Sequence, residues 1–482
     1  MTFRTRRSTL VVATTSAALV AAGLVATPAG ATTDPDPSSF ASGVTTKEVL
    51  RHLEALQDIA DEHGGTRASG TPGYDASGDY VQGLLEDAGY DVERQPFDFV
   101  HTETIAATFL VGAAPVEVIV MEYSPSTAEG GVTAPLRALP ADDPTPGCEP
   151  TDFDGSVAGT IVVVSRGVCA FGDKQAHATA AGAVGVLVSN NEPGPLVGTL
   201  GGPVEGAPAG GISQEDGVAL RAQLAADPAL PGTLDLRQLR ENRTTFNLIA
   251  QTPHGDPDNV VMLGAHLDSV VEGPGINDNG TGSAGVLQTA LELAWLGQPT
   301  QNAVRFAWWG AEESGLLGSL EYVASLDEAQ LAQITGYLNF DMIGSPNYVI
   351  GVYDADQSTY QAPVAVPPGS ESLEQVFTDY FDGTGQPWVD TEFSGRSDYQ
   401  GFIEAGIPAS GLFTGADDVK TEEEVALFGG TAGIPHDPNY HAAADDLANV
   451  DLKALKINSR AIAFATLSLA TDPSPLDLTD NG

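Results

Sequence analysis

From Phe246 onward, short apolar segments alternate with longer segments of helical periodicity. The apolar segments, which read as strands, are 246–252, 259–266, 303–310, 336–342 and 409–415. The helical segments are 282–295, 315–326, 373–381 and 452–469. Strands that alternate with helices favour a parallel sheet covered on both faces, because each crossover helix returns the chain to the same edge. We therefore predict an α/β fold with a mostly parallel, mixed sheet and helices on both faces.

Residues that can bind a metal stand at or near the ends of these predicted strands. They are His266 in GAHLDS, Asp278 in INDNGTG, Glu312 and Glu313 in FAWWGAEESG, Asp341 in NFDMIGS, and His441 in DPNYHAAADD. Any one of these fragments alone is weak evidence for a metal site. Adjacent glutamates, for example, usually stand at the start of a solvated helix. Together, two imidazoles and three carboxylates suit two zinc ions that share a bridging carboxylate, and one glutamate is left to act as a base.

The ordered set resembles the co-catalytic zinc peptidases of peptidase family M28, which include secreted bacterial leucyl aminopeptidases, glutamate carboxypeptidases and transferrin-receptor-like proteins. That resemblance implies the phosphorylase/hydrolase-like fold of these peptidases and two zinc ions per chain. By match to the family motifs, Asp278 bridges both metals. His266 and Asp341 would complete one zinc, and Glu313 and His441 would complete the other.

The same resemblance assigns catalytic roles. Glu312 would take a proton from the attacking water and deliver it to the departing amine. Tyr440 would stabilise the oxyanion of the tetrahedral intermediate. Asp268, two residues beyond His266, would orient that imidazole. Related secreted enzymes often carry cysteines that flank the Tyr-His pair, whereas the segment HDPNYHAAADD has none, which puts the rigidity of the His441 loop in doubt.

The expected substrate is the amino terminus of a peptide or protein. Glu312 and Asp341 could supply the fixed negative charge that a free α-amine requires. Four residues match positions that line the first substrate pocket of the secreted leucyl aminopeptidases: Met342, Gly395, Arg396 and Phe413. Methionine and phenylalanine favour an apolar side chain there, of the leucine or phenylalanine type. The resemblance therefore implies a zinc metalloaminopeptidase.

Between residues 110 and 238 the chain becomes rich in glycine, proline and short valine-rich strands. This segment resembles an inserted, β-rich protease-associated (PA) domain, with residues 153–194 as its strand, loop, helix and strand. The alternative is a lobe of the catalytic domain itself. In the first reading, residues 45–109 and 239–472 form a discontinuous zinc peptidase domain, and residues 473–482 are a tail.

The only two cysteines, Cys148 and Cys169, lie in this segment. In an exported chain they are most simply a disulfide. A thiolate metal site is the competing reading, but it lacks CxxC spacing and has no histidine nearer than His177.

Residues 1–31 have the pattern of a secretory signal peptide, with three arginines, an apolar stretch and a small-residue end at 29–31. We therefore expect a secreted protein, exported by either the general or the twin-arginine route. A flexible leading segment, residues 32–44, would follow. No other stretch could span a bilayer.

The formal charge is −45, and removal of residues 1–31, with three arginines and no acid, would make it −48. Such a surface repels polyanions, so we exclude nucleic acid as a partner. We expect a monomer. The acidity reflects either plain solubility or adaptation to saline surroundings.

Three other functions deserve comparison with the aminopeptidase reading. Residues 280–285 satisfy GxGxxG, but no strand runs directly into that motif as a dinucleotide site requires. A non-catalytic receptor-like protein should have lost metal ligands, and all five positions are filled. A carboxypeptidase or glutaminyl cyclase could use the same two-zinc site, although only Arg396 offers an obvious cationic group for an acidic side chain.

Overall fold

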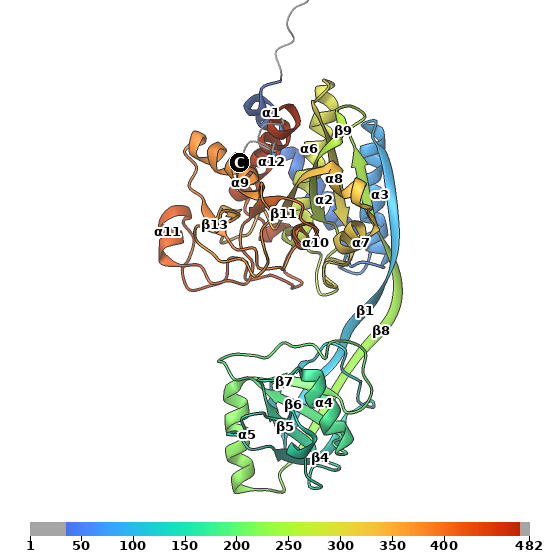
Figure 1. Cartoon of the computed structure of the whole chain (residues 1–482), viewed down its shortest axis with the longest axis vertical. Coiled ribbons are helices and arrows are strands. Elements are labelled where there is room, and N and C mark those ends of the chain that lie inside the picture. Colours follow the sequence, from blue (N-terminus) through green and yellow to red (C-terminus); the bar gives the residue numbers. More distant parts are fainter. Residues whose placement is uncertain (1–34, 473–482) are drawn as a thin grey trace, which may run out of the picture.

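The computed structural model describes residues 35–472, so the predicted signal peptide and tail lie outside the described residues. Figure 1 shows two bodies that are joined by a long two-stranded ribbon. The ribbon consists of β1 (Asp91–Val111) and β8 (Pro231–Gln251), which pair antiparallel along their whole length. The predicted domain boundaries at residues 110 and 238 both fall inside these strands, because the two bodies share one continuous ribbon.

The larger body contains a mixed sheet in the order β13-β12-β14-β11-β9-β10-β8. Its further strands are β9 (Asp256–His266), β10 (Asn302–Trp309), β11 (Ile334–Asp341), β12 (Gly351–Tyr353), β13 (Val389–Thr391) and β14 (Ala409–Phe413). The central strands β10, β9, β11 and β14 are parallel, whereas β8 pairs antiparallel with β10 and β12 pairs antiparallel with β14. Strand β13 runs parallel to β12. The predicted fold class is therefore confirmed.

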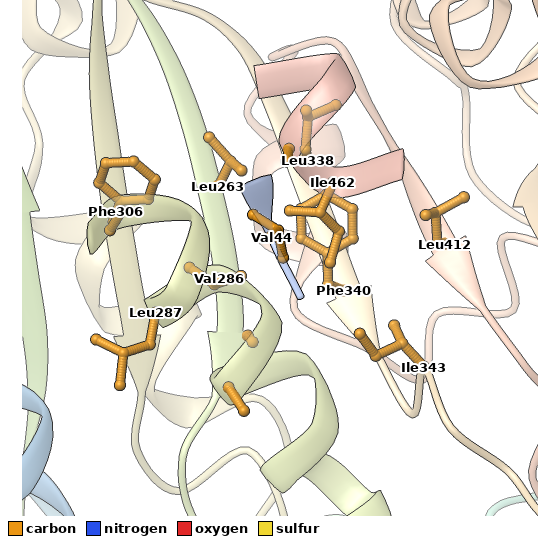
Figure 2. Packing of buried hydrophobic residues seen from close by; sticks show 14 of the residues in the cluster. Val44, Leu263, Val286, Leu287, Phe306, Leu338, Phe340, Ile343, Leu412 and Ile462 are labelled. Atoms are coloured by element: carbon orange, nitrogen blue, oxygen red, sulfur yellow. The ribbon is translucent and has the colours of Figure 1, made fainter. Parts of the chain in front are cut away.

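Helices cover both faces of this sheet. One face carries α2 (Thr46–Glu62), α3 (Pro72–Asp87), α6 (Gly282–Leu296), α9 (Ser370–Thr384) and α12 (Leu452–Thr471); the other carries α7 (Leu317–Ser325), α8 (Glu328–Gln333) and α10 (Tyr399–Glu404). Successive residues of β9 alternate between the two cores, with Leu263 in the first and Met262 in the second. Figure 2 shows Leu263 and Phe340 packed near Ile462 of α12. Burial of each such side chain contributes about 1.5–3 kcal/mol.

The segment predicted to be flexible, residues 32–44, forms helix α1 (Pro37–Gly43) over most of its described part. Asp36 caps this helix by accepting a hydrogen bond from the backbone N–H of Ser39 (2.9 Å). Phe40 and Ala41 are buried in the main core, and α1 packs on α12. The prediction of flexibility was wrong here. It followed from the polar composition of the segment, but the burial of Phe40 in the core holds the helix in place.

The smaller body contains β4 (Val132–Ala138), β5 (Ile161–Ser165), β6 (Gly185–Ser189) and β7 (Ala209–Ile212), all parallel, with β3 (Ile119–Val120) antiparallel to β7. Strand β2 (Ala114–Val116) pairs with β1, and helices α4 (Phe171–Ala180) and α5 (Gln214–Ala226) pack on this sheet. Cys148 and Cys169 form the predicted disulfide. No helix among residues 35–472 is long and apolar enough to cross a membrane.

Candidate metal centre and active site

Five predicted metal ligands meet at the carboxyl edge of the large sheet. His266 is the last residue of β9, and Asp341 is the last residue of β11. Glu313 follows β10, and Asp278 lies in the turn Ile276–Thr281 that leads into α6. These positions share one edge because the three strands are parallel. His441 reaches the same place from the loop between α11 (Glu422–Phe428) and α12.

Asp278 lies between the two imidazoles. Its Oδ1 is 3.2 Å from Nε2 of His266, and its Oδ2 is 3.2 Å from Nε2 of His441. On the first side, Nε2 of His266 is also 3.5 Å from Oδ1 of Asp341. On the second side, Nε2 of His441 is 2.9 Å from Oε2 of Glu313. Each oxygen of Asp278 therefore belongs to a separate group of three ligand atoms.

This donor set fits zinc. Zinc binds imidazole nitrogen and carboxylate oxygen at about 2.0–2.2 Å in tetrahedral geometry, which separates neighbouring ligand atoms by roughly 3.3 Å. The four distances above scatter around that value. In addition, Nε2 of His266, Oδ1 of Asp341 and Oε1 of Glu313 are buried and have no hydrogen-bond partner among residues 35–472. Buried polar atoms are rarely left unpaired, so these atoms are suited to bind a cation.

The pKa values of the residues at the site also indicate that it favours a cation. Burial raises the pKa of Glu313 to about 7, and the neighbouring Asp278 adds to that rise. Burial lowers the pKa of His441, but hydrogen bonding to Asp278 and Glu313 outweighs it and raises the pKa to about 10. His266 behaves in the same way, with its pKa raised well above the ordinary value mainly by Glu312 and Asp341. The crowded carboxylates favour positive charge, and for that reason they raise the pKa of the imidazoles. The same negative charge favours the binding of a divalent cation.

The two adjacent glutamates face different ways. Oε2 of Glu313 contacts His441, whereas Glu312 lines the open cavity above the site. Glu312 approaches His266 only at 3.9 Å. Burial raises its pKa well above the ordinary value, despite the opposing effect of His266. A cavity-facing carboxylate with a raised pKa is suited to accept and release a proton during catalysis.

Tyr440 and Arg396 lie beside this site. The Tyr440 ring stacks on His441 with ring centroids 3.8 Å apart. Nη2 of Arg396 donates to the Tyr440 hydroxyl at 3.4 Å, and Nη1 donates to Asp417 at 3.0 Å. Both Tyr440 and Arg396 line the cavity, as expected for residues that meet a substrate.

Asp268 contacts His266 differently from the expectation. Nδ1 of His266 hydrogen-bonds to the main-chain carbonyl of Asp268 at 3.1 Å, whereas the carboxylate Oδ1 is 3.6 Å away. That carboxylate accepts a hydrogen bond from the backbone N–H of Glu312 at 3.3 Å. Asp268 therefore links the strand-end histidine to the glutamate segment rather than acting on the imidazole alone.

The cavity above the ligands has a volume of about 510 Å³. Met342, Arg396 and Phe413 line it, as expected. Gly395 does not; its N–H donates to the Tyr399 hydroxyl at 2.9 Å, and its φ of +79° suits glycine. Its predicted place in the pocket is therefore not reproduced, although it positions the neighbouring arginine.

Sequence reasoning did not identify Ser397 and Asp398, which follow Arg396. The Ser397 hydroxyl donates to Oδ2 of Asp341 at 2.6 Å and accepts from Nδ2 of Asn339 at 2.8 Å. Ser397 thus leaves Oδ1 of Asp341 free for a metal. Asp398 is fully buried, and burial raises its pKa to about 7. Their place in the segment GRSDYQ, next to a predicted pocket residue, was the available signal.

The loop that carries His441 is fixed by buried carboxylates instead of cysteines. Asp445 accepts hydrogen bonds from the backbone N–H groups of Asn277 (2.9 Å) and Asp278 (3.0 Å). Asn449 donates to Asp445 and also to Asp437. These bonds tie the His441 loop to the turn that carries Asp278, so the loop has other contacts in the place of flanking cysteines.

Three non-glycine residues at the site have positive φ angles: Ala311 (+53°), Met342 (+46°) and His441 (+54°). Ala311 directly precedes Glu312, and Met342 directly follows Asp341. Such conformations cost about 1–3 kcal/mol each and are concentrated at functional sites. Here they turn the chain at the strand ends so that the ligands converge.

Comparison with known proteins agrees with this arrangement. The model of Peptidase family M28 matches residues 247–466, and that of the PA domain matches residues 132–220. A probable lipoprotein aminopeptidase of Mycobacterium tuberculosis is 46% identical over 436 residues, which cover 89% of this chain and 86% of the relative. Leucine aminopeptidase 2 of Trichophyton rubrum is 45% identical, with 88% of this chain and 84% of the relative covered.

Two solved structures are also similar. The aminopeptidase from Aneurinibacillus sp. strain AM-1 matches with a TM-score of 0.70 at 27% identity, covering 90% of this chain and 96% of that one. The zinc aminopeptidase BSAP from Bacillus subtilis matches with a TM-score of 0.62 at 26% identity, covering 89% and 96%.

Proposed function

This chain belongs to peptidase family M28 and carries a PA domain, and from that premise we propose that it is a zinc-dependent aminopeptidase for apolar amino-terminal residues. The observation that carries the proposal is the position of Asp278, whose two oxygens each lie 3.2 Å from a different imidazole. A carboxylate shared in this way suits two metal ions.

We assign His266, Asp341 and Oδ1 of Asp278 to one zinc, and His441, Glu313 and Oδ2 of Asp278 to the other. Zinc held by these residues would supply Lewis acidity, which polarises a substrate carbonyl and lowers the pKa of water. Ser397 and Asp445 keep the ligands in place, Ser397 through Asp341 and Asp445 through the backbone of Asp278.

Glu312 is the proton carrier in this proposal. It lines the cavity, and burial raises its pKa well above the ordinary value. It takes a proton from the attacking water and passes it to the departing amine. The Tyr440 hydroxyl, oriented by Arg396, donates a hydrogen bond to the carbonyl oxygen as negative charge develops there.

The free α-amine of the substrate is held by Glu312 and Asp341, which line the same cavity within reach of one ammonium group. The first side chain then points toward Met342 and Phe413, whose apolar surfaces favour leucine or phenylalanine. Secretion, the action on peptide amino termini and a monomeric state belong to the same proposal. The two relatives described above, both aminopeptidases by name, support it.

The proposal is tested with leucyl and phenylalanyl anilides in free and N-acetylated form, on protein whose zinc content is measured. Acetylation deletes the charge on the amine, so the free forms should be hydrolysed and the acetylated forms should not. Peptides should shorten by one residue per step from the amino end when followed by mass spectrometry. Equal rates on free and blocked anilides, or shortening from the carboxyl end, would refute the aminopeptidase assignment.

A further inference from the structure

The active-site cavity extends well beyond the space that a leucyl side chain fills. Its lining runs along the sheet edge from Asp341 on β11, past Phe413 on β14 and Tyr353 on β12, to Asp390 on β13. Neighbouring strands lie about 4.8 Å apart, so the three steps from β11 to β13 span roughly 14 Å. The part of this path near β11 and β14 includes the apolar residues Met342 and Phe413. The part near β13, called the far part below, is lined by acidic residues.

Four carboxylates line the far part: Asp390, Glu392, Asp418 and Glu424. Burial raises the pKa of the Tyr360 phenol, and the negative charge of these same four acids raises it further, so they surround one place. Within residues 35–472, Glu392 and Asp418 form no ion pair. Arg396, the arginine in the lining, is already paired with Asp417.

Two side chains in this far part carry buried polar atoms without a hydrogen-bond partner among residues 35–472. His436 is 5% exposed, lines the cavity, and has neither ring nitrogen hydrogen-bonded within the described part of the chain. Its Nε2 is 3.5 Å from Oε2 of Glu424. Oδ1 of Asp390 is also buried without a partner there. Burial lowers the pKa of His436, so at neutral pH its ring offers a lone pair.

The backbone is shaped to let His436 reach this position. A Cβ added to Gly415 would lie 2.4 Å from Cγ of His436, and the φ of Gly415 is +90°. Only glycine fits both the conformation and the contact. The unbonded atoms of His436 and Asp390 lie in the same part of the cavity as Glu392 and Asp418. Such a lining suits a group that donates several hydrogen bonds and carries positive charge.

We propose that this cavity also accepts an amino-terminal lysine or arginine, whose alkyl stem lies on Phe413 and whose cationic group lies among the four far carboxylates and His436. The inference rests on the proposed aminopeptidase function, because the α-amine held at Asp341 fixes where the first side chain begins. A lysyl side chain extends about 6 Å from Cα. Its ammonium therefore extends beyond the near part of the cavity in the direction of the far carboxylates that line the same cavity.

The test compares lysyl, arginyl, norleucyl and leucyl anilides, because norleucine has the lysine stem without the ammonium. The wild-type protein should cleave the lysyl anilide with a kcat/KM at least equal to that for the norleucyl anilide. Replacement of two far acids, Glu392→Gln with Asp418→Asn, should lower the lysyl-to-norleucyl ratio roughly three- to tenfold, as expected for the loss of partly exposed ion pairs. Neither side chain has a structural partner within residues 35–472, so the melting temperature should be retained.

A matched control makes the same charge change at exposed positions outside the cavity, Glu423→Gln with Asp379→Asn. This control should keep the wild-type ratio. Salt gives a second readout on the wild-type protein, because the ratio should fall between low and high sodium chloride as the charges are screened.

The outcomes separate this inference from the proposed function. Cleavage of the leucyl anilide with a lysyl-to-norleucyl ratio far below one would overturn the basic pocket and leave the aminopeptidase standing. No turnover of any anilide by zinc-loaded protein would instead remove the proposed function. An equal fall of the ratio in both double variants would attribute the effect to overall surface charge and refute the pocket. A preference for lysine only at the second position, seen with Ala-Lys against Lys-Ala dipeptides, would refute it as well.

Discussion

Substitution of Ser397 by alanine should weaken zinc binding without destroying the fold. The Ser397 hydroxyl donates to Oδ2 of Asp341 at 2.6 Å, and both groups are buried. A hydrogen bond to a charged group contributes about 1.5–3 kcal/mol, which corresponds to roughly 10- to 150-fold in an equilibrium constant. Loss of a residue that orients a metal ligand typically costs about 10–100-fold in metal affinity. We therefore expect zinc at the His266–Asp341 position to bind about 10–100-fold more weakly.

The same change also leaves Nδ2 of Asn339 without the acceptor to which it donates at 2.8 Å, the Ser397 hydroxyl. An unpaired buried donor costs about 1–3 kcal/mol, so the free energy of unfolding should fall by about that amount. A structural defect alone would lower the melting temperature and leave zinc affinity unchanged. The loss of zinc affinity and the loss of stability can therefore be measured separately.

The assay is zinc competition with a chromophoric chelator, with kcat of the leucyl anilide followed against free zinc. Activity of Ser397→Ala should recover at saturating zinc. Ser410→Ala is the matched control, because Ser410 is buried on the neighbouring strand β14 and its hydroxyl has no hydrogen-bond partner among residues 35–472. Its zinc affinity should equal that of the wild type. The reasoning fails if Ser397→Ala also binds zinc as tightly as the wild type.

Three further predictions follow from the same contacts. Glu313→Gln should lose zinc at the His441 position; retention of two zincs per chain by elemental analysis would mean that the two glutamates are assigned the wrong way round. Replacement of residues 113–230 by a two-residue turn, which the pairing of Val111 with Gly232 permits, should leave turnover of small anilides largely intact and change that of longer peptides; loss of small-substrate activity in folded, zinc-loaded protein would give the PA domain a part in the site. The melting temperature should rise from dilute buffer to about 1 M sodium chloride, where the Debye length is about 3 Å, because a chain of charge −45 repels itself; a flat or falling curve would leave the acidity as solubility alone.

The predictions from the sequence were most successful for features that depend on short stretches of the chain. The strands that end at His266 and Asp341 have strong apolar patterns, and ligands at the ends of parallel strands converge by topology alone. The fold class, the family and the enzyme class, a zinc aminopeptidase of family M28 with a PA domain, are confirmed. The Cys148–Cys169 bond is confirmed as well. The ligand roles stay predictions that the geometry supports.

What the sequence did not predict depends on contacts between distant segments. Ser397 bonds to Asp341 although 56 positions separate the two residues along the chain. Asp445 holds Asp278 across 167 positions. Helix α1 was missed because its stability comes from Phe40 in the core rather than from its own composition. Such contacts carry no periodic signal that one sequence could reveal.

The central claim is that Glu312 carries the proton at a two-zinc site that Asp278 bridges. In this assignment Glu312 lines the cavity and is not a zinc ligand, although its carboxylate lies within 4.8 Å of ligand atoms of His266 and Asp341. The most direct measurement is therefore the zinc content of Glu312→Gln together with its kcat on the leucyl anilide. We expect two zincs per chain, an unchanged melting profile and a kcat lower by at least about 10³-fold. Near-normal turnover, or loss of zinc from this variant, would contradict the claim.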